Sequence, residues 1–132
     1  MSITLTIPAP VDHLGKALWI NANSRDHWAV KARLTKQWRR LGHVHAMQAG
    51  IPEMDRAHIV AVVHKTTARR FDAANLHPTL KAIVDGIVTD YGMLVDDDNE
   101  HLLGPDIRAG EKRDKPCITL TITPLPVAND CD

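Results

Sequence analysis

The chain has 132 residues, of which 44% are hydrophobic and 24% are charged. This length fits one domain with one core, and the composition excludes a fibrous or disordered protein. No apolar run approaches the roughly 18 residues that a membrane span needs, and the N-terminus lacks the pattern of a signal peptide. With only two cysteines, Cys117 and Cys131, we expect a cytoplasmic protein whose thiols are reduced.

The net charge of zero conceals a difference between the two halves of the chain. Residues 1–70 carry eleven Lys/Arg and four acids, whereas residues 71–132 carry five Lys/Arg and twelve acids. A basic half suits a polyanion and an acidic half suits cations. The alternative is that the halves neutralise each other on the folded surface, and charge alone favours this alternative because surface charges contribute little.

The first part of the chain predicts a strand and then a long helix. Residues 3–7 alternate apolar and polar side chains, as a half-buried strand does. A helix is expected from Ser24 or Asp26, either of which would cap it, to about Ala49. Gly50 would end it. The predicted apolar stripe comprises Val30, Leu34, Trp38, Leu41 and either Val44 or His45.

The predicted helix is also basic. Its charged side chains are spread around the sides outside the apolar stripe, which fits either a solvated helix or a helix that faces DNA. Trp28 and Trp38 are expected in the core, because a spacing of ten residues is taken to place them on similar faces. The candidates for contacts with DNA are Arg33, Lys36, Arg39 and Arg40.

The middle of the chain predicts a central strand. Residues 59–63 form a continuous, β-favouring apolar run, which is typical of a strand covered on both faces. His58 and His64 flank this run. Two histidines without further ligands at a suitable spacing do not make a zinc site, so we expect both to be structural.

A second helix is predicted to follow. It starts near Asn75 or Leu76 and stops at Gly92, a residue type that commonly ends helices. Lys81 and Asp85 are four residues apart and therefore share one face. The buried stripe comprises Leu80, Ile83, Val84, Ile87 and Tyr91.

The remainder predicts short strands joined by loops. A short strand is expected near residues 101–103, and residues 104–105 and 109–116 are expected to be loop. Residues 117–123 repeat the alternation of the first strand, with three apolar residues pointing inward. The tail from about residue 124 is expected to be flexible.

These elements follow one another in the order β-α-β-α-β, with one extra short strand. Such an order predicts a mixed α/β (α+β) fold, in which helices pack on a small mixed β-sheet. The whole chain, residues 1–132, is expected to form this one domain.

The chemistry is concentrated in residues 69–98, where carboxylates at high density either face water or hold a cation. Phosphodiester hydrolysis needs an activated water and neutralised phosphoryl charge, and Mg²⁺ held by two or three carboxylates supplies both. Asp72 at a strand end, Asp97 from a later turn and Asp85 from the helix between them would suit such a site. Lys81 would contact the scissile phosphate. The arginines that would grip the DNA backbone are Arg69 and Arg70.

The order of these residues resembles the RusA family of Holliday junction resolvases, in its actinobacterial and mycobacteriophage branch. That branch carries a motif like D-x-x-N-x-x-P-T-x-K-x-x-x-D-G, followed by a glycine and an Asp-Asp pair. An Asn-x-Asn-x-Arg-x-His-Trp segment before the basic helix and the outer strands match more loosely. The residues that match the motif here are Asp72, Asn75, Pro78, Thr79, Lys81, Asp85, Gly86, Gly92, Asp96 and Asp97.

This resemblance implies a homodimeric, Mg²⁺-dependent endonuclease, with Mn²⁺ as a substitute, that cuts four-way DNA junctions in recombination and repair. It implies that Asp72, Lys81 and Asp97 are catalytic. Asp98 lies beyond the matched pair and is expected outside the site. The implied metal ligands are Asp72, Asp85, Asp96 and Asp97.

The chain also departs from the better-known branch of that family. Ala74 stands where those members have a second aspartate, and the distance from there to the lysine is three residues longer. Phe71 stands where they have an arginine, so Arg70 takes that role only by a shift of one residue. Three consequences are open: Asp85 completes the metal site, one metal suffices, or activity is weakened.

Other functions are compatible with the same sequence. One is a catalytically impaired module of the same fold that binds junctions or other DNA and does not cut it. Another is a metal-dependent nuclease for flaps, forks or RNA. The last is an acidic loop in an unrelated soluble domain.

Overall fold

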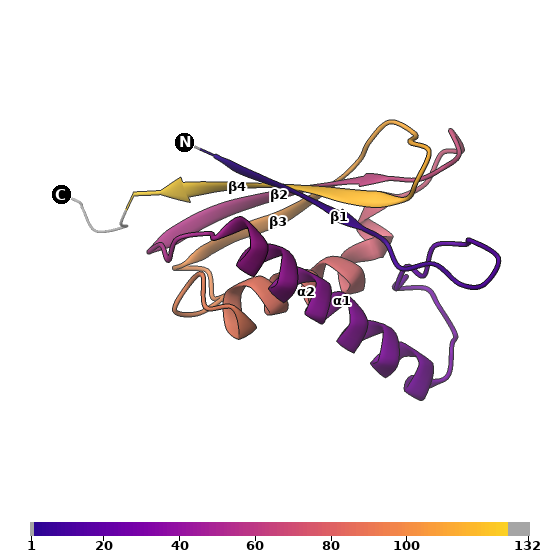
Figure 1. Ribbon diagram of the computed structural model, residues 1–132, viewed down its shortest axis with the longest axis horizontal. Helices are drawn as coiled ribbons and strands as arrows, with labels where there is room; N and C mark the ends of the chain where they lie inside the picture. Colours follow the sequence, from indigo (N-terminus) through magenta and orange to yellow (C-terminus); the bar gives the residue numbers. More distant parts are fainter. Residues whose placement is uncertain (1, 127–132) are drawn as a thin grey trace.

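The computed structural model describes residues 2–126, in which two helices cover one face of a four-stranded sheet (Figure 1). The strand order is β1-β4-β2-β3, with β4 antiparallel to both neighbours and β3 parallel to β2 at the edge. The predicted mixed α/β class is therefore confirmed. The strands are β1 (Ile3–Pro8), β2 (Arg56–His64), β3 (Leu102–Ala109) and β4 (Cys117–Leu125).

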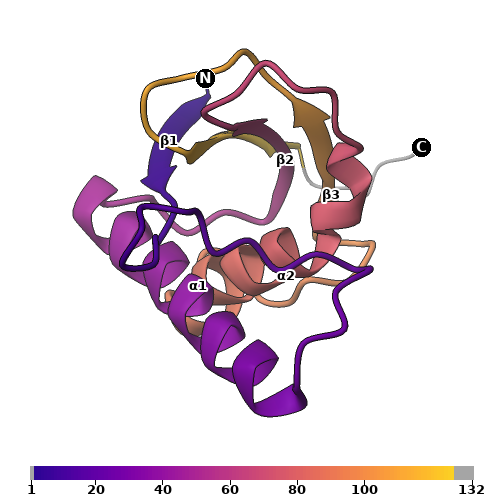
Figure 2. The same cartoon turned by 90° about the vertical axis from the view of Figure 1, so that its right-hand side faces the viewer.

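The alternation of side chains decides which face of the sheet is buried. In β4, Ile118, Leu120 and Ile122 are fully buried between partly exposed threonines, as predicted. In β2, buried residues likewise alternate with the partly exposed Val60 and Val62. The expectation that β2 is covered on both faces is wrong, because both helices pack on the same side of the sheet (Figure 2). β-Branched residues suit the open face of a pleated strand as well as the buried one.

The first helix, α1, spans Trp28–Ala49 and begins later than predicted. Its N-cap is His27, whose Nδ1 accepts the backbone N–H two residues further on at 3.1 Å. Ser24 and Asp26 lie before the helix, in irregular chain. Gly50 ends α1 in the left-handed conformation at φ +63°, which confirms the predicted stop.

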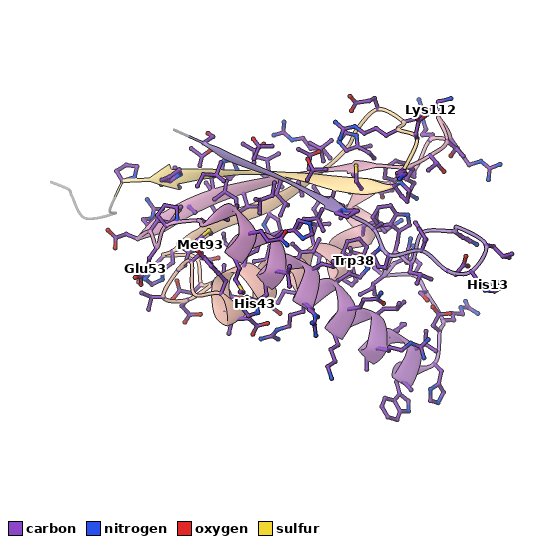
Figure 3. The ribbon with its side chains drawn as sticks, in the orientation of Figure 1. His13, Trp38, His43, Glu53, Met93 and Lys112 are labelled. Atoms are coloured by element: carbon purple, nitrogen blue, oxygen red, sulfur yellow. The ribbon has the colours of Figure 1, made fainter. Side chains whose placement is uncertain are left out.

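The two tryptophans of α1 lie on different faces. Trp38 is fully buried between α1 and the sheet (Figure 3), where its ring stacks on Trp19 with centroids 5.6 Å apart. Trp28 is 75% exposed. The expectation that both are in the core is wrong, because ten residues rotate an α-helix by about 280° beyond two full turns.

The second helical segment is continuous but changes its winding. It runs through η1 (Ala73–Leu76, a 3₁₀ turn), α2 (His77–Asp85) and η2 (Gly86–Asp90, a π turn). The segment ends at Asp90, two residues before the predicted stop at Gly92, which has φ +93°. The predicted stripe residues Leu80, Ile83, Val84 and Ile87 are buried, and Tyr91 is partly buried. Neither this segment nor α1 is long and apolar enough to cross a membrane.

The edge strand β3 is longer than predicted and includes Gly104 and Pro105, which were expected in a loop. Gly104 has φ +97°, and the pairing with β2 shifts register between His58 and Val60. A glycine and a bulge thus let the strand continue through a Gly-Pro pair, a sequence that is typical of a turn. The predicted loop after Ala109 is present.

The end of the chain is more regular than expected as far as it is described. Pro124 and Leu125 belong to β4, although they were assigned to a flexible tail. The rest of that tail, residues 127–132, lies outside the described residues, as does Cys131. Cys117 is buried and forms no disulfide within residues 2–126.

Two glycines bring the helices close together. A Cβ on Gly42 of α1 would overlap the carbonyl oxygen of Ile83 in α2, and a Cβ on Gly86 would overlap the carbonyl oxygen of Arg39 in α1. Both glycines are buried. The backbones of the two helices therefore touch without intervening side chains, and this contact fixes the position of α2.

Substituting Gly86→Ala should destabilise the fold by about 1–3 kcal/mol, because the added methyl forces the two helix backbones apart. Thr89→Ala is the matched control, since Thr89 is exposed in the same π turn and should change stability by less than about 0.5 kcal/mol. Urea unfolding followed by circular dichroism measures both. Equal midpoints for the two variants would contradict the close contact.

Candidate active site

The site is built around the ammonium group of Lys81 on α2. Its Nζ lies 2.8 Å from Asp85 Oδ1 and 2.8 Å from Asp97 Oδ2. The contact with Asp85 confirms the prediction that these two residues share a helix face. Asp97 is sixteen residues further along the chain than Lys81, so its contact depends on the path of the loop.

Buried residues anchor that loop and turn Asp97 back over α2. Met93 and Leu94 are 0% and 3% exposed. The backbone N–H of Met54 donates to the Met93 carbonyl at 2.9 Å, and that of Met93 donates to the Ile87 carbonyl at 3.2 Å. Residues 93–95 form a bend rather than a strand, and the buried Met93 and Leu94 fix the position of the carboxylates that follow.

The hydrogen bonds at this site shift the pKa values of Lys81 and Asp97. Hydrogen bonds to Asp85 and then to Asp97 raise the pKa of Lys81 above its ordinary value. The hydrogen bond from Lys81 lowers the pKa of Asp97. Asp97 therefore stays ionised, and Lys81 stays protonated, across the physiological range. Because the Lys81 side chain is 52% exposed, these pairs are worth only about 0–1 kcal/mol of stability.

Asp72 is placed differently from the other predicted acids. It is exposed at the start of the second helical segment, where its Oδ1 accepts the backbone N–H of Ala74 at 3.1 Å. It makes no ion pair within residues 2–126. Asp96 is also exposed, and its Oδ1 accepts the backbone N–H of Asp97 at 2.7 Å. The structure thus brings Asp85 and Asp97 together and leaves Asp72 outside their contact.

A separate cluster of two acids and a histidine lies in the chain directly after Asp97. Asp98, Glu100 and His101 have possible ligand atoms within 4.8 Å of one another, and they are the one such trio in the described part of the chain. His101 Nδ1 and Asp98 Oδ1 are 2.6 Å apart, a contact that raises the pKa of His101 and lowers that of Asp98. The predicted ligands Asp72, Asp85, Asp96 and Asp97 form no comparable trio within residues 2–126.

The predicted DNA contacts divide into exposed and paired residues. Arg33, Lys36 and Arg40 are exposed along α1. Arg39 instead binds Asp90 with two hydrogen bonds of 2.7 and 2.9 Å, which join α1 to η2. Arg69 and Arg70 are exposed in the chain between β2 and η1.

The carboxylates that meet at Lys81 fit a divalent cation. Asp85 and Asp97 direct their oxygens at one position, which a positive charge, the Lys81 ammonium, already occupies. Mg²⁺ prefers carboxylate oxygens and keeps several waters, so two protein carboxylates are within its usual range. The Lys81 side chain is half-exposed, so there is solvent into which it can move from that position.

Sequence reasoning missed the exposure of Trp28 and the convergence of Arg69, already a predicted DNA contact, with Lys16 and Lys65. Trp28 is the first residue of α1, and the centroid of its ring lies 5.5 Å from that of His27. Lys16, Lys65 and Arg69 line one pocket together with Trp19. Their separation along the chain leaves no local pattern, so no sequence signal could have grouped them.

The fold and site define a small mixed α/β domain with a lysine held between two carboxylates on its second helix. No family model matches the chain, and no curated protein matches it either.

The lowered pKa of Asp97 gives a test of the Lys81 contact. Lys81→Met should raise the pKa of the Asp97 carboxyl towards 3.8, because the hydrogen bond and the positive charge are both lost. In the unsubstituted protein the stabilisation from this pair is complete above pH 3.8 and is lost as the pH falls through the lower pKa of the folded state. Carboxyl-carbon NMR titration measures the shift, with Asp90, paired to Arg39, as the internal control. An unchanged Asp97 titration would show that the contact is absent in solution.

Proposed function

We propose that this protein is a Mg²⁺-dependent, structure-selective endonuclease that cuts branched DNA, in the manner of the RusA-type Holliday junction resolvases that its sequence resembles. The observation that carries the proposal is the meeting of Lys81, Asp85 and Asp97. Lys81 and Asp85 belong to one segment of the matching motif, whereas Asp97 belongs to the Asp-Asp pair at its end. A chance motif would not require its distant members to meet at one point.

The two carboxylates would hold the cation, and Asp72 or Asp96 would add ligands only by moving their side chains. When bound, Mg²⁺ supplies an activated water and neutralises phosphoryl charge. Lys81 carries its positive charge beside both carboxylates and is exposed, so it can turn to the scissile phosphate and stabilise the charge that develops there. Asp97 orients Lys81 through the 2.8 Å hydrogen bond.

DNA would be held by the basic surface of α1 and by the arginines before Asp72. Arg33, Lys36 and Arg40 are exposed and make no ion pair within residues 2–126, and they offer guanidinium and ammonium groups of the kind that contact phosphates. Symmetric cleavage of a four-way junction needs two active sites related by a two-fold axis, so the working form would be a homodimer.

The second candidate is a module of the same kind that binds branched DNA without cutting it. The observation in its favour is that Asp72 caps η1 and makes no contact with the Lys81 site, while Ala74 supplies no carboxylate nearby. A nuclease acting on flaps or forks shares the chemistry of the first candidate and differs only in the DNA that fits the basic surface.

Cleavage of a labelled four-way junction in Mg²⁺ should give paired symmetric nicks, and Asp97→Asn should reduce the rate by about 100-fold or more, because a cation ligand and the orienting partner of Lys81 are both lost. Gel analysis of the products, beside linear duplex and flap substrates, measures this.

The matched control for that experiment is Asp114→Asn, an identical change in the exposed loop before β4, which should cut at the original rate. Tight junction binding without nicks in either Mg²⁺ or Mn²⁺ would establish the binding module instead. Equal activity in Asp97→Asn would remove Asp97 from the site.

Neutralising Arg33, Lys36 or Arg40 to Gln should weaken junction binding and reduce the slope of log K against log salt by about 0.9 per lost phosphate contact. Arg39→Gln is the contrasting variant: its guanidinium is paired with Asp90, so it should mainly lower the stability of the fold. Fluorescence anisotropy at several salt concentrations measures the slopes. Unchanged slopes in the first three variants would exclude α1 from the DNA interface.

A further inference from the structure

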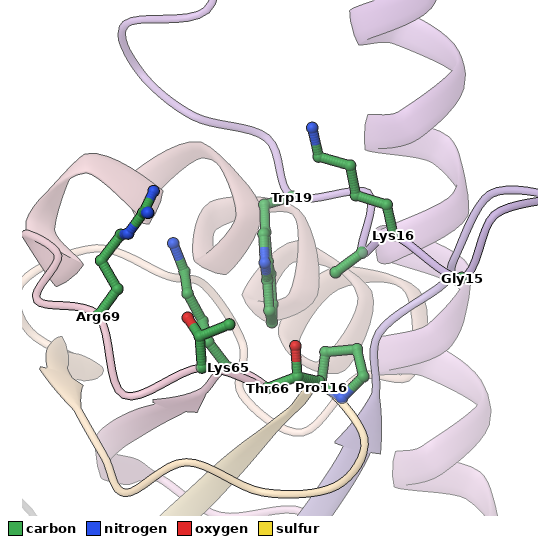
Figure 4. Close-up of a pocket in the computed structure, with 9 residues that line it drawn as sticks. Gly15, Lys16, Trp19, Lys65, Thr66, Arg69 and Pro116 are labelled. Atoms are coloured by element: carbon green, nitrogen blue, oxygen red, sulfur yellow. The ribbon is translucent and has the colours of Figure 1, made fainter.

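A cationic pocket lies apart from the Lys81 site, at the end of β2. Its volume is about 340 Å³, which is within the range of small-ligand pockets. Three of its lining side chains are Lys16, Lys65 and Arg69, and no lining residue is acidic. Figure 4 shows the Lys65 and Arg69 side chains pointing the same way, with the ring of Trp19 between Lys65 and Lys16. Residues from three distant parts of the chain thus form one positively charged hollow.

These three cations have no anionic partner among residues 2–126. The described ion pairs engage three Lys/Arg residues and three histidines, and none engages a pocket cation. The nearest acid in sequence to Lys16 is Asp12, and its Oδ1 accepts two backbone N–H groups in the same turn, at 2.8 and 2.9 Å. Like charges brought together without a counter-charge repel one another, so an anion that enters the pocket gains energy from all three.

Lys65 is the most constrained of the three. It is partly buried, and burial lowers its pKa. Its Nζ lies 4.2 Å from the centre of the Phe71 ring, a cation–π contact that holds the side chain in place. A lysine that is desolvated and oriented in this way forms a stronger hydrogen bond with an incoming anion than a fully solvated one does.

Trp19 provides an aromatic surface in the pocket. One face of its ring stacks on Trp38, at an interplanar angle of 14°, so the ring is fixed. The ring also lines the pocket, together with Ala17 and Pro116. A fixed aromatic ring beside a group of cations is the arrangement with which proteins bind single-stranded nucleic acid, where a base stacks and a phosphate is paired.

We propose that this pocket binds one unpaired nucleotide of a DNA strand, with the phosphate at Lys65 and Arg69, the base or sugar against Trp19, and Lys16 on the other side of that ring. In a duplex the faces of the bases are stacked on one another, so a paired nucleotide cannot place a base on this ring. An unpaired nucleotide at a branch or strand end can.

This inference rests on the proposed function only in taking DNA as the ligand; it requires no cleavage. The pocket would hold an unpaired part of the DNA, while the Lys81 site acts on the backbone. Asp97→Asn should therefore leave nucleotide binding unchanged, and a failure of one proposal is distinguishable from a failure of the other.

The test is calorimetric titration of the full chain with a 5′-phosphorylated thymidine dinucleotide, with its unphosphorylated counterpart and with inorganic phosphate. Lys65→Gln and, separately, Arg69→Gln should weaken binding of the phosphorylated dinucleotide about ten-fold, as expected for one charge-assisted hydrogen bond. Arg25→Gln is the matched control: it removes one positive charge from an exposed position outside the pocket and should bind as the unsubstituted protein does.

A second readout tests the role of Trp19. The indole N–H signal of Trp19 should move in NMR spectra during the titration, with Trp28→Phe used to assign the exposed ring. Unchanged affinity in both Lys65→Gln and Arg69→Gln would overturn the proposal. So would equal affinity for inorganic phosphate and the dinucleotide, because the pocket would then recognise only an anion, and so would movement of the Trp28 signal alone.

Discussion

The contact between Gly42 and Gly86 is the constraint on which the rest of the arrangement depends. It lets two helix backbones touch, and so it sets where α2 lies under the sheet. Lys81 and Asp85 are carried on α2, directly before this contact. The Arg39–Asp90 pair joins the same two helices on the other side of Gly86. Since a side chain at either glycine would separate the helices, the position of the candidate active site follows from the absence of two Cβ atoms.

The candidate site holds one cation between two anions. Lys81 pairs with both Asp85 and Asp97 but offsets only one of their two negative charges, so the site keeps a net negative charge. A divalent cation would take over that role and release Lys81 for an anion. Under the proposed function, such an exchange of one cation for another would link metal binding to the availability of a positive charge for phosphate. By contrast, the cations of the pocket beside Trp19 make no ion pair within residues 2–126, so an anion would bind them without displacing a counter-charge from that part of the chain.

The whole molecule places its basic and acidic halves on different structural elements. The basic residues lie mainly on α1 and around the end of β2, whereas the acids of the candidate site lie on α2 and in the loop that follows. The interpretation that the halves simply neutralise each other therefore holds only in part. Arg39 and Asp90 do so. Arg33, Lys36 and Arg40 are exposed on α1 and make no ion pair within residues 2–126.

The sequence by itself determined the element order, the buried faces of β4 and α2, and the Lys81–Asp85 pair, because these follow from periods of two and of about 3.6 residues. Three predictions from the sequence were wrong. Helix rotation places Trp28 on the exposed face, the cap at His27 sets a later start of α1, and a bulge lets β3 continue through Gly104 and Pro105. Only the tertiary structure decided that Asp97 meets Lys81 while Asp72 does not, and that Lys16, Lys65 and Arg69 share a pocket. Such contacts depend on how loops fold back between elements, and residues far apart in sequence leave no periodic signal of meeting.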